Sequence, residues 1–200
     1  MNEKAGRTKA IPAPFGTEKP WLAKVAARGT WLLLILLVGG CASPGTQRAR
    51  PADLAAVITE LSPAVDRTEA KTLAKTALET ASELVHEYRA VRPAILQNCL
   101  VNVGLRERGL CYHWADDLGA RLRALQLTSL DIHSGAARVG TFREHNAVVV
   151  TARGKPFATG VVLDAWRHSG RLYWGQVASD KYPWLPAPPT LDAHLDNLSP

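Results

Sequence analysis

The spacing of apolar residues predicts four helices between residues 51 and 125. The clearest runs from Asp66 to Tyr88, where small and apolar side chains recur every three or four positions, as on the buried face of a helix. Asp66 and Glu69 at its start form a capping-box pattern. Further helices are expected over residues 51–61 and 94–105. A fourth begins at Cys111, where Ala115, Leu118, Leu122 and Leu125 form an apolar stripe.

The pattern changes to that of β-strands beyond residue 129. The stretches "HNAVVVTA" (145–152), "GVVLDAW" (160–166) and "GRLYWGQV" (170–177) are β-branched or aromatic and are separated by short turn sequences. "SLDIHSGAARVG" (129–140) is a further candidate strand. Because such short connections join antiparallel strands, we expect an α+β fold with N-terminal helices packed on an antiparallel sheet. The expected domain spans residues 51–186, and a proline-rich tail (187–200) runs over the surface.

The first 40 residues have the layout of an export signal. Six basic residues precede the apolar run "WLLLILLV" (31–38), and small residues follow it. The run is far shorter than the roughly 20 residues that a helix needs to cross a bilayer. The sequence from Val38 to Cys41 resembles the lipobox of bacterial lipoproteins. That resemblance implies a signal peptide over 1–40, lipid attachment at Cys41, and a flexible tether over 41–50.

The lipobox resemblance also implies a partner and a location. The protein is expected to bind the membrane through its lipid anchor in the cell envelope. Ala42 follows Cys41, where an aspartate would resemble an inner-membrane retention signal, so we expect the outer membrane, with the domain facing the periplasm. Residues 1–40 hold six of the 24 basic and two of the 18 acidic residues, which leaves 18 and 16 and a net charge of +2. This balance gives no basis for nucleic-acid binding.

Cys111 opens the fourth expected helix, and its residue type leaves four interpretations open. It can be a core residue, the disulfide partner of Cys99, a metal ligand with a residue such as His113, or a nucleophile. Cys99 lies on a helix with apolar neighbours, which favours burial over a disulfide. A single Cys-x-His pair is weak support for a metal site, and no metal is expected. At a helix start, free amides and the helix dipole favour a thiolate, which supports the nucleophile.

A histidine and an aspartate follow Cys111 on successive expected strands. The sequences "GLCYHWADDLGARLRAL", "REHNAVVV" and "VVLDAW" resemble the transglutaminase-like branch of the papain-like cysteine peptidases over about residues 109–174. The resemblance implies a papain-like core in which Cys111 is the nucleophile, His145 the general base and acid, and Asp164 the group that orients His145. It implies no cofactor.

Papain-like enzymes often add a side-chain amide to the backbone N–H of the nucleophile, and together these groups hold the oxyanion. Asn102 is our first choice for that amide, with Asn98 and Gln97 as alternatives. None of the three lies at the short offset before the cysteine that papain has.

Three further side chains bear on the expected site. Trp114 and Trp166 are expected to line the cleft, although packing in the core is an open alternative for both. Asn146 follows His145 on the same strand, so its side chain should point to the opposite face of the sheet.

The expected function is therefore thiol-dependent acyl transfer by a lipid-anchored protein. A peptidase or amidase that acts on envelope peptides is the first choice, and protein crosslinking is the second. The alternative is a non-catalytic lipoprotein that uses the same fold to bind a protein or peptide. A redox lipoprotein that uses Cys99 and Cys111 is a third hypothesis. The sequence leaves the substrate, the acyl acceptor and the oligomeric state open.

Overall fold

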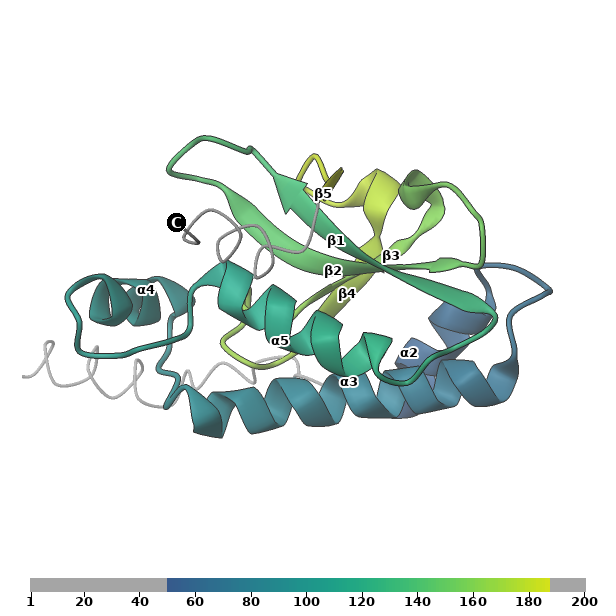
Figure 1. Cartoon of the computed structure of the whole chain (residues 1–200), viewed down its shortest axis with the longest axis horizontal. Coiled ribbons are helices and arrows are strands. Elements are labelled where there is room, and N and C mark those ends of the chain that lie inside the picture. The colour runs from purple at the N-terminus through teal and green to yellow at the C-terminus, as the bar shows by residue number, and fades with distance from the viewer. Residues whose placement is uncertain (1–49, 188–200) are drawn as a thin grey trace, which may run out of the picture. The chain divides into compact units, whose positions relative to one another are not determined.

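Residues 50–187 are the part of the chain that the computed structural model describes (Figure 1). The expectations for residues 1–49 and 188–200, including lipidation of Cys41, lie outside it. The helices are α2 (Pro51–Thr59), α3 (Arg67–Glu87), α4 (Ala94–Asn102) and α5 (Cys111–Arg123). The strands are β1 (Leu130–Ala137), β2 (His145–Ala152), β3 (Val161–Asp164), β4 (Tyr173–Gln176) and β5 (Leu185–Ala187), with single 3-10 turns η1 (Phe157–Thr159) and η2 (Val177–Ser179). The α+β prediction is confirmed.

The five strands form one antiparallel sheet in the order β4-β3-β2-β1-β5. Strand β2 lies at its centre, and each of its eight residues is buried. Val149 of β2 lies opposite Val162 of β3. Because side chains alternate between the two faces of a sheet, His145 and Asp164, each an even number of residues from this pair, share its face. The register thus brings the expected histidine and aspartate to one face, at one end of two neighbouring strands.

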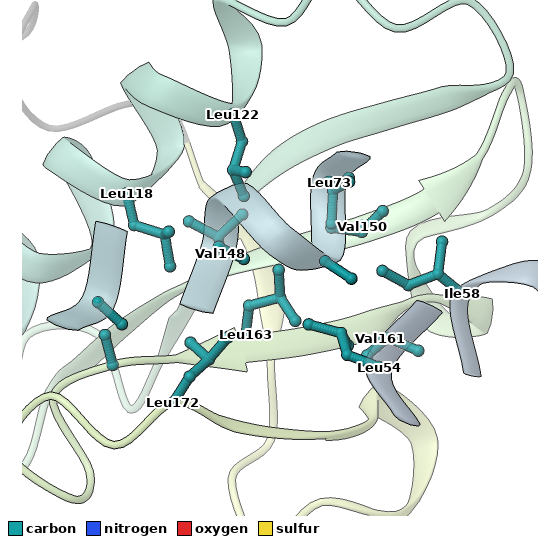
Figure 2. Packing of buried hydrophobic residues seen from close by; sticks show 14 of the residues in the cluster. Leu54, Ile58, Leu73, Leu118, Leu122, Val148, Val150, Val161, Leu163 and Leu172 are labelled. Atoms are coloured by element: carbon teal, nitrogen blue, oxygen red, sulfur yellow. The ribbon is translucent and has the colours of Figure 1, made fainter. Parts of the chain in front are cut away.

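Helices α2, α3 and α5 cover the opposite face of the sheet, which Val148, Val150 and Leu163 line. Figure 1 shows α5 between the sheet and the long helix α3. Figure 2 shows how the apolar side chains of these elements meet in one core; it labels Leu54, Ile58, Leu73, Leu118, Leu122, Val148, Val150, Val161, Leu163 and Leu172. This packing fixes α5 over β2, so the first residue of α5 lies close to the start of that strand.

A smaller apolar cluster covers the face that His145 shares. It combines Val149 and Val162 with Val177 and Trp184, and Tyr182 packs against it. Trp184 is buried, and residues 185–187 pair with β1. Of the expected proline-rich tail (187–200), the structure describes Ala187, which pairs with Ser134 of β1 and so belongs to the sheet. The edge of β1 is covered by β5 for this reason.

The start of α3 differs from a reciprocal capping box. The side chain of Asp66 caps the helix by accepting hydrogen bonds from the amides of Thr68 and Glu69. The carboxylate of Glu69 does not return to the amide of Asp66, which instead donates to Ser129 Oγ. Glu69 accepts four hydrogen bonds from the backbone and hydroxyl groups of Thr128 and Ser129. It therefore ties the start of α3 to the turn before β1.

Helix α4 turns a different face inward from the one expected. Its buried residues are Ala94 and Gln97, whereas Leu96, Cys99 and Val103 are exposed. Gln97 donates to the carbonyls of Tyr88 and Arg108 and accepts from the amide of Val91. These three hydrogen bonds to backbone groups hold the polar face of α4 against the domain, and the apolar face is left outside.

Candidate functional site

The segment that leads into α5 is held by hydrogen bonds on both sides of its backbone. The amides of Gly109 and Leu110 donate to Nδ1 of His113, at 3.1 and 3.2 Å. The indole Nε1 of Trp114 donates to the carbonyl of Gly109 at 3.0 Å. Burial and the nearby Arg108 lower the pKa of His113 to about 4, so at neutral pH the ring is uncharged and free to accept. These contacts fix the position of Cys111, the first residue of the helix.

Gly109 is required by this geometry. Its φ of +126° lies in a region that side chains rarely adopt, and a Cβ atom there would lie 2.6 Å from Cγ of Gln97. A larger residue would displace either Gln97 or the start of α5. The backbone conformation therefore requires glycine two residues before Cys111.

The thiol of Cys111 lies against the backbone and side chains at the start of β2. Its Sγ atom is 3.9 Å from the carbonyl oxygen of Glu144 and 3.8 Å from Nδ2 of Asn146. Cys111 is partly exposed, and neither Cys111 nor Cys99 forms a disulfide. The interpretation of Cys111 as a core residue is therefore wrong, as is the expected burial of Cys99. Cys99 is exposed because of the orientation of α4, and Cys111 is accessible because it lies at the start of α5, beyond the core.

His145 and Asp164 form a buried pair beside this thiol. Nε2 of His145 lies 2.7 Å from Oδ2 of Asp164, and the two residues are 2% and 1% exposed. Burial opposes the charge on His145, but the hydrogen bonds with Asp164 and Cys111 outweigh it and raise the pKa of His145 to about 9. Burial would also raise the pKa of Asp164, yet the bond from His145 keeps it below its ordinary value. Both shifts favour the charged pair, an imidazolium beside a carboxylate.

Nε2 is the ring nitrogen of His145 that bonds to Asp164. Because an ionised carboxylate only accepts hydrogen bonds, Nε2 must be the donor to Asp164. This leaves Nδ1 as the ring atom for the thiol of Cys111. The three residues expected to act together are thus assembled at the junction of α5, β2 and β3.

A second ion pair supports Asp164 from behind. The backbone amide of Arg167 donates to Oδ1 of Asp164 at 2.9 Å, and its Nε donates to Oδ2 at the same distance. The guanidinium also donates to both carboxylate oxygens of Asp180, and the Asp180 side chain is fully buried. Four charges, on His145, Asp164, Arg167 and Asp180, therefore alternate in sign through the site.

Three aromatic rings surround the imidazole of His145. The ring centroids of Trp166, Tyr182 and Trp184 lie 4.8, 4.6 and 5.3 Å from that of His145. They exclude water from the His145–Asp164 hydrogen bond, which strengthens it. Trp166, which was expected to line the cleft, lies against the ring of His145. Trp114 does not line the site, because it is 2% exposed and packs in the helix-side core.

The candidate oxyanion amides occupy three different environments. Asn102 is exposed at the end of α4, and no hydrogen bond within residues 50–187 joins it to the site. Gln97 is used by backbone groups, as described above. Asn98 accepts a hydrogen bond from Nε1 of Trp166 at 3.0 Å, so it is the amide of α4 that the site reaches. Asn102, the first choice, lies a full turn beyond the contact between α4 and Trp166, and its role stays a prediction.

Asn146 was expected on the face of the sheet opposite His145. It does lie on the helix-side face, but Cys111 approaches from that side, and its amide therefore contacts the sulfur. Arg167, Asp180, Tyr182 and Trp184 were not predicted as site residues. Arg167 had a detectable signal, a cation three residues after the candidate aspartate in a turn. The other three lie in loops whose path the sequence pattern does not specify.

Comparison of the chain with protein-family models, with curated proteins and with solved structures found no match in any of the three. Within residues 50–187, no three His, Cys, Asp or Glu side chains are grouped as metal ligands would be. None of the helices in that range has the length and apolar character of a membrane span.

Proposed function

We propose that this protein is a cysteine-dependent acyl-transfer enzyme with a papain-like core, and that it cleaves amide bonds of envelope peptides. The observation that carries the proposal is the buried His145–Asp164 pair beside a partly exposed thiol at a helix start. A raised imidazole pKa provides a cation next to sulfur at neutral pH, and this cation favours the thiolate.

The geometry supports a two-step reaction. The Cys111 thiolate attacks the carbonyl carbon of an amide, a C–S bond forms, and the carbonyl electron pair moves to oxygen. The backbone N–H of Cys111, at the first position of α5, has no acceptor within the helix, so it can donate to that oxyanion. Nδ1–H of His145 protonates the departing nitrogen as the C–N bond breaks, and a thioester and an amine result.

The second step restores the enzyme. The neutral imidazole accepts a proton at Nδ1 from a water molecule, and the oxygen of that water attacks the thioester carbon. The C–S bond breaks to return the thiolate beside an imidazolium, and the acyl group leaves as a carboxylic acid. Asp164 keeps Nε2 protonated throughout, so Nδ1 alone moves protons.

The test is acylation by p-nitrophenyl acetate, followed by peptide mapping of the acetylated chain. The proposal predicts a burst of nitrophenolate and an acetyl group on Cys111. It also predicts loss of both in Cys111→Ser and in His145→Ala. Acetylation of Cys111 no faster than that of the exposed Cys99 would contradict an enzyme and favour a binding module.

The lipid anchor is a separate part of the proposal, supported by the order of basic, apolar and small residues before Cys41. It predicts that cells fed radiolabelled palmitate incorporate it into the wild-type protein and not into Cys41→Ser. An unlabelled wild-type chain would contradict the anchor and leave the site unaffected.

A further inference from the structure

The large apolar side chains that residues 50–187 leave exposed belong to a few segments: α4 and the turn after it, the start of α5, the turn between β1 and β2, and β5. Their exposed fractions run from 38% for Tyr112 to 95% for Phe142. Single exposed apolar residues are ordinary, whereas a gathered patch marks an interaction surface. We call this set the apolar rim: Ile95, Leu96, Val103, Leu105, Tyr112, Val139, Phe142 and Leu185.

Contacts with the site place the rim around the thiol. Helix α4 carries Ile95 and Leu96, and it is joined to the site by the hydrogen bond between Asn98 and Trp166. Tyr112 follows Cys111 directly. Figure 1 shows α4, the start of α5 and the turn between β1 and β2 at the same end of the domain.

The other side of the rim comes from the turn between β1 and β2 and from β5. The turn contains Val139 and Phe142 and leads into Glu144, whose carbonyl lies 3.9 Å from the sulfur. Leu185 pairs with Ala136, one position from the pair that Ala137 makes with His145. Segments that carry exposed apolar side chains therefore reach the site from two directions, α4 through the bond between Asn98 and Trp166, and the turn through Glu144.

The charged residues in these segments are mainly basic. The α4 side holds Arg92 and the partly buried Arg106 and Arg108, the turn holds Arg138 and Arg143, and the acids among them are Glu107 and Glu144. Of the acidic residues in the same segments, Glu144 already accepts a hydrogen bond from the amide of Gly140. An occupant that complements this surface has apolar side chains and a negative net charge.

We propose that the apolar rim docks an acidic polypeptide segment with large apolar side chains, which it lays across the Cys111 thiol. The role of the docked segment as substrate rests on the proposed function. The docking itself rests on the exposed side chains and their charges. Because the rim is divided between segments that reach the site from two directions, it suits a chain that crosses the site better than a flat lipid surface.

The test is fluorescence anisotropy with the full-length chain and three fluorescein-labelled peptides that carry no reactive group. The first is Glu-Leu-Phe-Leu-Glu, the second replaces its apolar residues with Ser-Asn-Ser, and the third replaces its acids with lysine. We expect the first to bind about tenfold more tightly than either of the others. Phe142→Ser and Leu105→Ser should each remove most of that preference, and Lys155→Ser, at the far end of β2, should leave it unchanged.

Equal affinity for the three peptides, or an unchanged preference in both rim variants, would overturn the proposal. Two further results would overturn it if the peptides do not bind: binding of phosphatidylglycerol vesicles that depends on Phe142, or self-association of the chain that depends on Phe142. Because the peptides do not react with thiols, their binding is independent of whether Cys111 is catalytic. An inert Cys111 with selective peptide binding would end the proposed function and leave the docking surface in place.

Discussion

The charge on His145 should make the stability of the protein fall as the pH rises from 7 to 9.5. Its folded pKa of about 9 lies above the model-peptide value of 6.5. A raised pKa stabilises the fold fully below 6.5, and the contribution is lost as the pH rises through 9. The shift corresponds to about 3 kcal/mol. Linkage then predicts that most of this, about 2 kcal/mol, is lost between pH 7 and 9.5.

Urea unfolding measures this loss directly. With a slope of about 2 kcal/mol per molar urea, the midpoint should fall by roughly 1 M across the range. His145→Gln, which removes the titrating group, should lack that fall. The pKa of His113 is lowered to about 4 and that of His168 is also lowered, so both are neutral throughout. Parallel curves for the wild type and His145→Gln would refute the charged His145–Asp164 pair.

Three other predictions follow from contacts around the site. Asp180→Asn should lower the pKa of His145, because Arg167 is then free to compete more strongly for Asp164. Arg167→Gln should not lower that pKa. NMR titration of the His145 ring measures both variants, and equal shifts would contradict the competition. Asn98→Ala should slow acylation by p-nitrophenyl acetate roughly 100-fold through loss of an oxyanion donor, with iodoacetamide alkylation unchanged and Asn102→Ala silent in both assays. Glu69, whose pKa is lowered to about 2 mainly by its bond from Ser129, stabilises the fold above pH 4.5 and loses that contribution as the pH falls towards 2; urea midpoints of Glu69→Gln should lack this acid dependence.

The elements and the three central residues of the site were predictable because short-range rules determine them. The 3.6-residue spacing of apolar side chains in α3 and the β-branched run of β2 each specify one element. The placement of His145 and Asp164 then follows from strand alternation and an antiparallel register. Cys111 at a helix start is the third residue of the site, and its role was predictable from the order of the helix and the two strands.

The remaining features depend on contacts between different elements, which the sequence pattern does not encode. Gln97 forms hydrogen bonds with three backbone groups outside α4, and so the polar face of this helix points inward. Arg167 and Asp180 met because a loop folds back past β4. Trp184 entered the core because β5 pairs with the far strand β1. In each case a hydrogen bond, an ion pair or a buried ring between different elements determined the position of the side chain, and the local sequence pattern did not.

Alkylation of Cys111 by iodoacetamide near pH 7 tests the thiolate most directly, with the exposed Cys99 as the reference within the same chain. An ordinary cysteine is only a few per cent thiolate at that pH. A thiol beside the His145 cation should therefore react about tenfold or more faster than Cys99, and it should lose that advantage in His145→Ala. Equal rates at the two cysteines, unaffected by the loss of His145, would contradict the account.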